Sequence, residues 1–266
     1  MPASDLENQR SIQSIEIGGR LLNALALQSG PMSLKELAQA AEMTASKAHP
    51  YLVSFGRLGL IEQERDSGQY RLGPAALQLG LSCLRQLDPL KIAGPLMEQL
   101  SERIQQSVVI AVWGNLGPTV VRMIESHQPI HVNMRVGTVM SVNHTATGKI
   151  FAAFMPEQKL EALKGIALGD RMVRDQKIVD VALPSQELAR IKRTAMAQAI
   201  GQPIPGIHAL SAAVFDQFGA LALAITALGP AESFDVALEG PIAQALRDTA
   251  DQISRRLGQP RSRSAA

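Results

Sequence analysis

The stretch that most constrains the fold is positions 33–72, where two helical stripes and a candidate hairpin follow one another closely. Ser33 is followed three residues later by Glu36, the spacing of a capping box in which each side chain hydrogen-bonds the backbone N–H of the other residue. Apolar residues then recur at helical spacing in two groups, Leu34, Leu37, Ala38 and Ala41, and Ala48, Tyr51, Leu52, Phe55 and Leu58. Two helices separated by residues 42–44 are therefore expected.

A hairpin is expected directly after the second of these helices. Residues 60–64 and 69–72 predict two short strands, with a turn at 65–68 between them. Another helix is expected upstream, at residues 11–28. Three helices followed by a hairpin are typical of a winged helix-turn-helix, in which the third helix enters the major groove of DNA. The hairpin, or wing, then reaches a flanking groove or the phosphate backbone.

Polar residues on the third helix and in the wing are the candidate DNA contacts. Hydroxyls and free backbone N–H groups near a helix N-terminus can hold a phosphate, and Lys47 and His49 are the best candidates for groove contacts. The full set is Thr44, Ser46, Lys47, His49, Ser54 and Arg57 in the helix, and Arg65, Gln69 and Arg71 in the wing. The competing interpretation of each is a solvated surface residue, and Thr44 or Ser46 can equally be a plain helix cap.

Charge gives this DNA-binding hypothesis only local support. Residues 1–73 contain seven Lys or Arg and eight Asp or Glu, although phosphate neutralisation supplies much of DNA affinity. No acidic residue lies between Glu42 and Glu62, whereas Lys47 and Arg57 do. Pro50 falls inside the expected helix, where proline removes a hydrogen bond, so that helix is expected to start late or to be kinked. We expect Pro50 to reduce phosphate contact.

The second half of the chain changes from helical to strand-like periodicity at Ser107. Helices are expected at 74–87, 90–106, 145–155, 157–163, 185–199 and 235–257, and strands at 108–113, 119–125, 130–135, 207–216 and 220–228. This order predicts an α+β domain, an antiparallel sheet with packed helices. The expected organisation is therefore a DNA-binding domain at 1–73, a linker helix at 74–88, a sensor domain at 89–258 and a disordered tail at 259–266.

Composition excludes several classes of protein. With 46% hydrophobic and 19% charged residues the chain is neither disordered nor membrane-like, and the start MPASDLENQR lacks a signal-peptide pattern, so the cytoplasm is expected. The only cysteine, Cys83, excludes an internal disulfide and a Cys-rich metal site, and is expected to be buried in the linker helix. Gly148-Lys149 fails the phosphate-loop spacing because Asn143 stands where a glycine is required. No catalytic set, metal or cofactor is expected.

Four segments of the sequence together resemble the IclR family of bacterial regulators. They are SLKELAQAAEMTASKAHPYLVSFGRLGLIEQ at 33–63, GQYRLGPAALQLG at 68–80, VNHTATGKIFAAFMP at 142–156 and PGIHALSAAVFDQFGALALAITALGP at 205–230. The resemblance implies a GAF-like effector domain, a homodimer or homotetramer, a palindromic operator on double-stranded DNA and a small organic acid as effector. The IclR family includes both repressors and activators. Pro50 departs from the family pattern, which usually has a basic residue there.

The resemblance also implies where an effector would bind, between the sheet and the start of the TATGK helix. The residues carried over are Thr145, Ala146 and Thr147 at the helix start, and Ala209, Thr226 and Leu228 on the strands, with Trp113, Met123, Met134 and Met140 as candidate apolar walls. A helix N-terminus favours a carboxylate, and the threonines would add hydroxyl donors. Ala209 and Leu228 make the pocket more apolar than in small-acid binders, which favours a larger, aromatic acid. Ordinary core packing is the competing interpretation of the four wall residues.

Three functions remain open from the sequence. The leading one is a transcriptional regulator controlled by a small acid. The second is an enzyme acting on a small acid, and the third is a constitutive DNA-binding oligomer whose pocket is filled. Titration of acids while thermal stability is followed separates the first from the third, because a ligand that binds the native state raises the unfolding midpoint.

Overall fold

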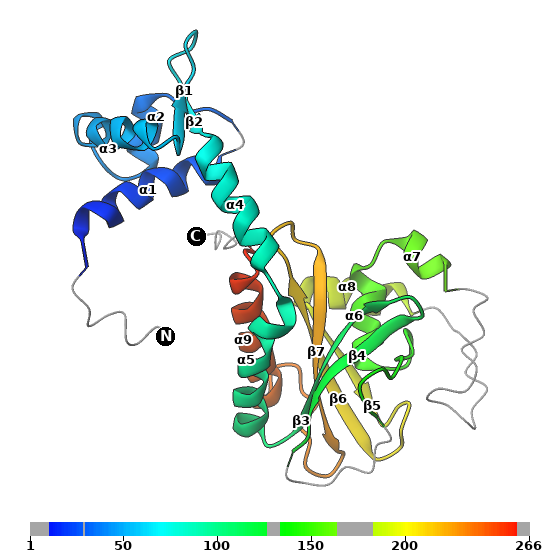
Figure 1. Ribbon diagram of the computed structural model, residues 1–266. Coiled ribbons are helices and arrows are strands. Elements are labelled where there is room, and N and C mark those ends of the chain that lie inside the picture. The colour runs from blue at the N-terminus through cyan, green and yellow to red at the C-terminus, as the bar shows by residue number, and fades with distance from the viewer. Residues whose placement is uncertain (1–10, 29, 127–133, 164–182, 260–266) are drawn as a thin grey trace. The chain divides into compact units, whose positions relative to one another are not determined.

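The computed structural model describes residues 11–28, 30–126, 134–163 and 183–259, which divide into two compact units, Met1–Leu87 and Asp88–Ala266 (Figure 1). Unit 1 contains α1 (Gln13–Leu27), α2 (Leu34–Ala40), α3 (Ala45–Arg57), β1 (Ile61–Gln63), β2 (Tyr70–Leu72) and α4 (Pro74–Gln86). Unit 2 contains α5 (Pro89–Ile104), β3 (Ser107–Gly114), β4 (Gly117–Ile124), α6 (Ala146–Phe154), α7 (Glu157–Glu161), α8 (Ser185–Thr194), β5 (Met196–Ile200), β6 (Ile207–Phe215), β7 (Leu221–Pro230) and α9 (Pro241–Arg256).

Unit 1 is the expected winged helix-turn-helix. Its core gathers Leu21, Leu37, Leu52 and Ile61 from α1, α2, α3 and β1. The predicted capping box is present at the start of α2, where the backbone N–H and the hydroxyl of Ser33 donate to Glu36 Oε2 at 2.8 and 2.7 Å. The backbone bond first, and then the hydroxyl bond, lower the pKa of the Glu36 carboxyl.

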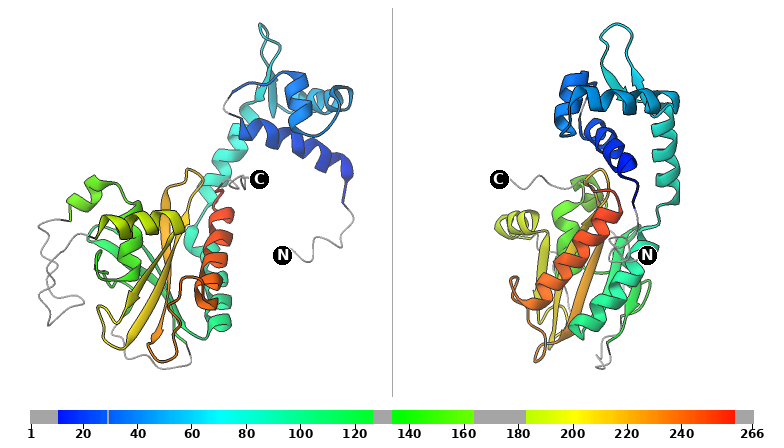
Figure 2. Two further views of the ribbon diagram at one scale, coloured as in Figure 1. Left: turned by 180° about the vertical axis from the view of Figure 1, so that it is seen from behind. Right: turned by 90° about the vertical axis from the view of Figure 1, so that its left-hand side faces the viewer.

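Unit 2 is built on a five-stranded antiparallel sheet in the order β4-β3-β7-β6-β5. Helices α5 and α9 lie side by side on one face, and α6 and α8 lie on the other (Figures 1 and 2). The α6 face of the sheet is lined by small buried residues, Ala111, Ala197, Ala213 and Ala224, against which Phe151 of α6 packs. Small side chains let the helix approach the strands closely, and Gly148 makes the approach tighter because a Cβ there would collide with the backbone of Ser141 and Val142.

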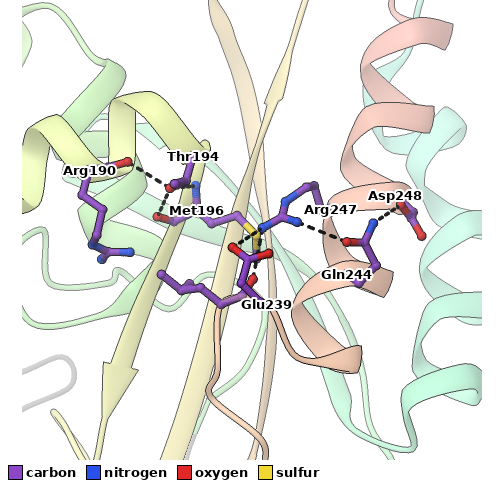
Figure 3. A network of polar contacts seen from close by, with 8 residues as sticks. Arg190, Thr194, Met196, Glu239, Gln244, Arg247 and Asp248 are labelled. Carbon is purple, nitrogen blue, oxygen red and sulfur yellow. Dashed lines mark hydrogen bonds and ion pairs between the residues drawn. The ribbon is translucent and has the colours of Figure 1, made fainter.

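The prediction of a helix over 185–199 was wrong in its second part. The helix ends at Ala195, which adopts left-handed backbone angles (φ 52°), and Met196–Ile200 forms the edge strand β5. The Thr194 hydroxyl donates to the carbonyl of Arg190 at 3.0 Å and so helps to close the helix (Figure 3). Pairing of Met196 with Ala212, and of Ala199 with Ala209, provides backbone bonds that outweigh the helical propensity of the alanines.

The closing helix begins later than predicted, at Pro241 and not at residue 235. Arg247 holds the preceding segment in a non-helical course: its Nη2 donates to the carbonyl of Leu238 at 3.1 Å and lies 3.9 Å from Glu239 Oε1 (Figure 3). Gly240 is the N-cap and Pro241 stands in the first turn, where proline costs no hydrogen bond.

Other expectations have mixed outcomes. Cys83 was expected to be buried but is exposed on α4. The predicted strand at 130–135 lies largely outside the described residues, and Met134 and Arg135 are not in a strand. Most of the tail expected to be disordered, 260–266, is also outside them. Among the described helices, none has the length and apolarity required to cross a membrane.

Candidate functional site

Helix α3 turns one face into the core of unit 1 and the other to solvent. Ala48 and Leu52 are buried in the core cluster. The candidate contacts from sequence, Thr44, Ser46, Lys47, His49, Ser54 and Arg57, are all exposed. Within the described residues neither Lys47 nor Arg57 forms an ion pair, so both charges are available to a phosphate or a base. The helix therefore presents an acid-free polar surface of the kind that enters a DNA groove.

Hydrogen bonds of Thr44 and Ser54 stabilise the start and the second half of α3. Thr44 is the N-cap and its hydroxyl oxygen accepts from the N–H of Lys47 at 3.3 Å, while Ser46 Oγ lies 3.1 Å from it. Pro50 lies inside a helix that runs continuously from Ala45 to Arg57, so the expected late start is wrong. The hydroxyl of Ser54 donates to the carbonyl of Pro50 at 3.0 Å.

The wing places its three candidate contacts in different surroundings. Arg65 is exposed in the turn, and Gln69 is half-buried, with its N–H bonded to Ser67 Oγ at 3.1 Å. Arg71 forms ion pairs within the hairpin, with Glu62 at 3.1 Å and Glu64 at 3.9 Å.

A pocket in unit 2 lies between the sheet and the start of α6. It encloses about 440 Å³ of empty space, including the part open to solvent. Its lining is Val109, Met134, Met140, Thr145, Ala146, Thr147, Ala199, Gln202, Pro203, Ile204, Ile207, Ala209, Thr226 and Leu228. The described lining is mostly apolar with a few polar groups, which is the character of a small-molecule site.

The threonine hydroxyl groups of the pocket donate their protons to other groups of the protein and do not direct them into the cavity. Thr147 Oγ1 lies 2.8 Å from Thr226 Oγ1, which donates to Ser211 Oγ at 2.9 Å, which in turn donates to the carbonyl of Ile225 at 3.2 Å. Because Thr226 has one hydroxyl proton and gives it to Ser211, Thr147 is the donor in the first bond. The Thr145 hydroxyl donates to the carbonyl of Ser141 at 2.7 Å. The hydroxyl protons expected to bind an acid are therefore already used.

Backbone donors at the start of α6 are further polar groups at this end of the pocket. Thr145 Oγ1 accepts from the N–H of Gly148 at 2.9 Å, and the N–H of Lys149 donates to the carbonyl of Thr145. The N–H groups of Ala146 and Thr147 have no acceptor among the described residues, and both residues line the pocket. Two free N–H groups at the positive end of a helix have the chemistry that suits an anion.

Lys149 fixes α6 to its neighbours one turn further on. Its Nζ lies 2.8 Å from Glu187 Oε1 on α8 and donates to the carbonyl of Gln198 on β5 at 3.2 Å. The two side chains are only 17% and 25% exposed, so the pair is shielded from solvent. The bond to Gln198 ties the helix start to the strand that carries Ala199 of the pocket lining.

The structure brings most, but not all, of the predicted effector residues together. Eight of the ten residues expected at the effector site line the pocket. Trp113 packs instead against Phe151, with ring centroids 5.7 Å apart, and Met123 packs in the cluster around Val109 without lining the pocket. Met134 does line it.

Sequence reasoning missed six lining residues: Val109, Ala199, Gln202, Pro203, Ile204 and Ile207. Ala199 was hidden in the wrongly extended helix, and the loop 201–206 carried no signal of its own. Val109 lies beside Thr226 only through the register of β3 and β7, which the sequence does not give. No group of three or more His, Cys, Asp or Glu in the described part of the chain could hold a metal.

A winged helix-turn-helix followed by an α+β unit with an effector-type pocket defines a DNA-binding transcriptional regulator. The sequence profiles described as "IclR helix-turn-helix domain" and "Bacterial transcriptional regulator IclR C-terminal" match residues 14–65 and 81–255. The chain belongs to the IclR family of bacterial transcriptional regulators.

Individual relatives agree with the family over nearly the whole chain. The crystal structure of Pseudomonas aeruginosa HmgR is 35% identical, with a TM-score of 0.84, and the match covers 94% of this chain and 100% of that one. The glycerol operon regulatory protein of Streptomyces griseus is 28% identical over 94% of this chain and 98% of its own length. The Agobacterium tumefaciens repressor BlcR has the same fold, at 24% identity, a TM-score of 0.76 and coverage of 95% and 100%.

Proposed function

We propose that this chain represses transcription from a palindromic operator and that a monocarboxylic acid with an apolar, aromatic body relieves or modifies this repression. The observation that carries the ligand class is the pair of free N–H groups of Ala146 and Thr147 at the edge of an apolar pocket. These donors would hold the carboxylate, and Met140, Ile207 and Leu228 would surround the body of the molecule.

Relatives support the direction of this proposal. Relatives are named as repressors, among them the transcriptional repressor IclR of Escherichia coli. An IclR homologue from Microbacterium hydrocarbonoxydans was crystallised in complex with 4-hydroxybenzoate and shares the fold, with 20% identity and a TM-score of 0.51. A carboxylate would suit the backbone donors of the pocket described above, and an aromatic body would suit its apolar lining.

The effector proposal is tested by removing one of the two N–H groups. Ala146→Pro deletes a donor in the first helical turn, where proline is tolerated, and Ala146→Val adds similar bulk while the N–H stays. We expect benzoate and phenylacetate, but not their neutral amides, to raise the melting temperature of the wild type. At about 100 times the Kd a ligand adds about 2.7 kcal/mol. Ala146→Pro should lose this response and Ala146→Val should retain it. Equal responses to acids and amides would contradict the carboxylate assignment.

DNA binding is proposed to be centred on α3, with Lys47, His49 and Arg57 as its charged or ionisable contacts and Thr44, Ser46 and Ser54 beside them. In the wing, Arg65 and Gln69 are proposed backbone contacts, and Arg71 is treated separately below. Binding to the gene's own upstream region, measured by fluorescence anisotropy, should fall for Lys47→Ala by a similar factor on every duplex if Lys47 contacts phosphate, and selectively on the operator if it contacts a base. Wild-type protein without any preferred site would refute the proposal.

A second copy of the chain is the proposed partner of α4. None of the described side chains of α4 is buried within this chain, and Leu77 and Leu81, one turn apart, are 63% and 45% exposed. Ile12 and Ile15, at the start of unit 1, are also exposed. An uncovered apolar helix suits a twofold interface, and a dimer matches a palindromic site. Leu77→Glu with Leu81→Glu should give a monomer in sedimentation, whereas a monomeric wild type would contradict this interface.

A further inference from the structure

The wing carries a charge arrangement that differs from that of α3. Residues 61–72 include three acids, Glu62, Glu64 and Asp66, and two bases, Arg65 and Arg71, which gives a net charge of 2 − 3 = −1. Helix α3 contains Lys47 and Arg57 and no acid. Two elements that flank one DNA surface in a winged helix therefore have opposite net charge.

The geometry of the hairpin places the wing charges against one another. Glu62 and Arg71 are register partners across the two strands, so their side chains lie on the same face. Arg71 Nη2 is 3.1 Å from Glu62 Oε2 and Arg71 Nη1 is 3.9 Å from Glu64 Oε1. One guanidinium is thus shared between two carboxylates.

The second carboxylate is itself held in place. The Ser67 hydroxyl donates to Glu64 Oε2 at 2.8 Å, so one oxygen of Glu64 is fixed by the turn while the other faces Arg71. The turn is closed by Gln63 Nε2, which donates to the carbonyl of Gly68 at 2.8 Å. The charged set is built into the hairpin and does not depend on a neighbouring element.

We infer that Glu62 and Glu64 occupy Arg71 in place of a DNA phosphate, so that the wing limits indiscriminate DNA binding rather than adding to it. This inference rests on the proposed DNA-binding function. A phosphate that approached Arg71 would have to displace two carboxylates and would face their repulsion. The salt dependence of binding counts the cations that neutralise phosphates, so a paired Arg71 adds little to it. Sequence-specific affinity then comes from α3, and the ratio of operator to random-site binding rises.

The test is a mutant cycle read by anisotropy on the operator duplex and on an unrelated duplex of the same length, at several salt concentrations. Exposed ion pairs contribute little to stability, so these variants should fold, which circular dichroism checks. Arg71→Gln alone should change the salt slope by less than about 0.3, because Arg71 is already neutralised. Glu62→Gln with Glu64→Gln should tighten binding to the unrelated duplex at least about threefold and steepen the slope by about 0.9, the value for one added phosphate contact.

Two further variants exclude a simple change of net charge. Adding Arg71→Gln to the double variant should return the slope to the wild-type value. Asp66→Asn, which also removes one acid from the wing but no partner of Arg71, should leave the slope unchanged. A loss of about 0.9 in slope for Arg71→Gln alone, or an unchanged slope for the double variant, overturns the inference while DNA binding stands. Wild-type protein that binds neither duplex overturns the proposed function and this inference together.

Discussion

The chain of hydroxyls beneath the pocket predicts an unusually costly substitution, Thr226→Val. Valine keeps the shape and the strand preference of threonine, so the change is confined to one oxygen and its proton. Two hydrogen bonds are lost, the one from Thr226 to Ser211 at 2.9 Å and the one from Thr147 to Thr226 at 2.8 Å. Thr147 is fully buried, so its hydroxyl proton is left without an acceptor.

The size of the effect follows from these two losses. An ordinary hydrogen bond contributes about 1 kcal/mol net, and a buried donor without a partner costs about 1–3 kcal/mol, which together predict a loss of about 2–4 kcal/mol. For a unit the size of Asp88–Ala266 each kcal/mol corresponds to about 2–4 °C, so the melting temperature should fall by roughly 4–16 °C. Trp113 is the only tryptophan and lies in β3, so its fluorescence reports the unfolding of unit 2.

A double variant tests the assignment of Thr147 as the donor to Thr226. Thr147→Val combined with Thr226→Val removes the orphaned donor, so it should be more stable than Thr226→Val alone, although it carries one more change. It should also bind an aromatic acid within about threefold of the wild type, because the carboxylate is held by backbone N–H groups. A double variant less stable than the single one would refute the assignment of Thr147 as the donor, and a double variant that has lost the acid would refute the backbone N–H groups as the carboxylate site.

Three other substitutions have defined outcomes. Gly148→Ala should prevent unit 2 from folding stably, because the new Cβ would collide with the carbonyl of Ser141, and Trp113 fluorescence would show it. Ser33→Ala should destabilise unit 1 at every pH, because the oxygen that accepts from the N–H of Glu36 is lost. The loss should be larger near neutral pH than in acid, because the hydroxyl bond to Glu36 lowers the folded-state pKa of that carboxyl, and this contribution is present above the unfolded-state pKa and disappears as pH falls through the folded-state pKa; circular dichroism of the helices can follow it. Pro50→Arg adds a cation to the exposed face of α3 and should steepen the salt dependence of operator binding by about 0.9; an unchanged slope would show that this position does not face phosphate.

Local sequence signals were sufficient for unit 1. The Ser33–Glu36 box, the apolar stripes of α2 and α3 and the turn of the wing are short-range features, and each is formed by residues within a few positions of one another. The ion pairing of Arg71 was not accessible in this way, since it depends on the register that places Glu62 opposite it.

In unit 2 the elements that long-range pairing decides were the ones predicted poorly. The alanine-rich strand β5 has no strand signal of its own and exists because β6 offers it partners. The start of α9 depends on the hydrogen bond from Arg247 to the carbonyl of Leu238, which the spacing of residues in the sequence does not predict. The helix-start part of the pocket followed from the family resemblance, whereas the loop with Gln202 and Ile204 follows from the fold alone.

Ala199 and Ala209, which face each other across β5 and β6 and both line the hollow beside α6, have a consequence for how such regulators diversify. An alanine codon becomes a valine codon through one nucleotide change. Either substitution would reduce the volume of the pocket without disturbing strand pairing. Both positions belong to unit 2, whereas α3 belongs to unit 1. The inducer recognised by a lineage could thus drift while the promoters it controls stay the same.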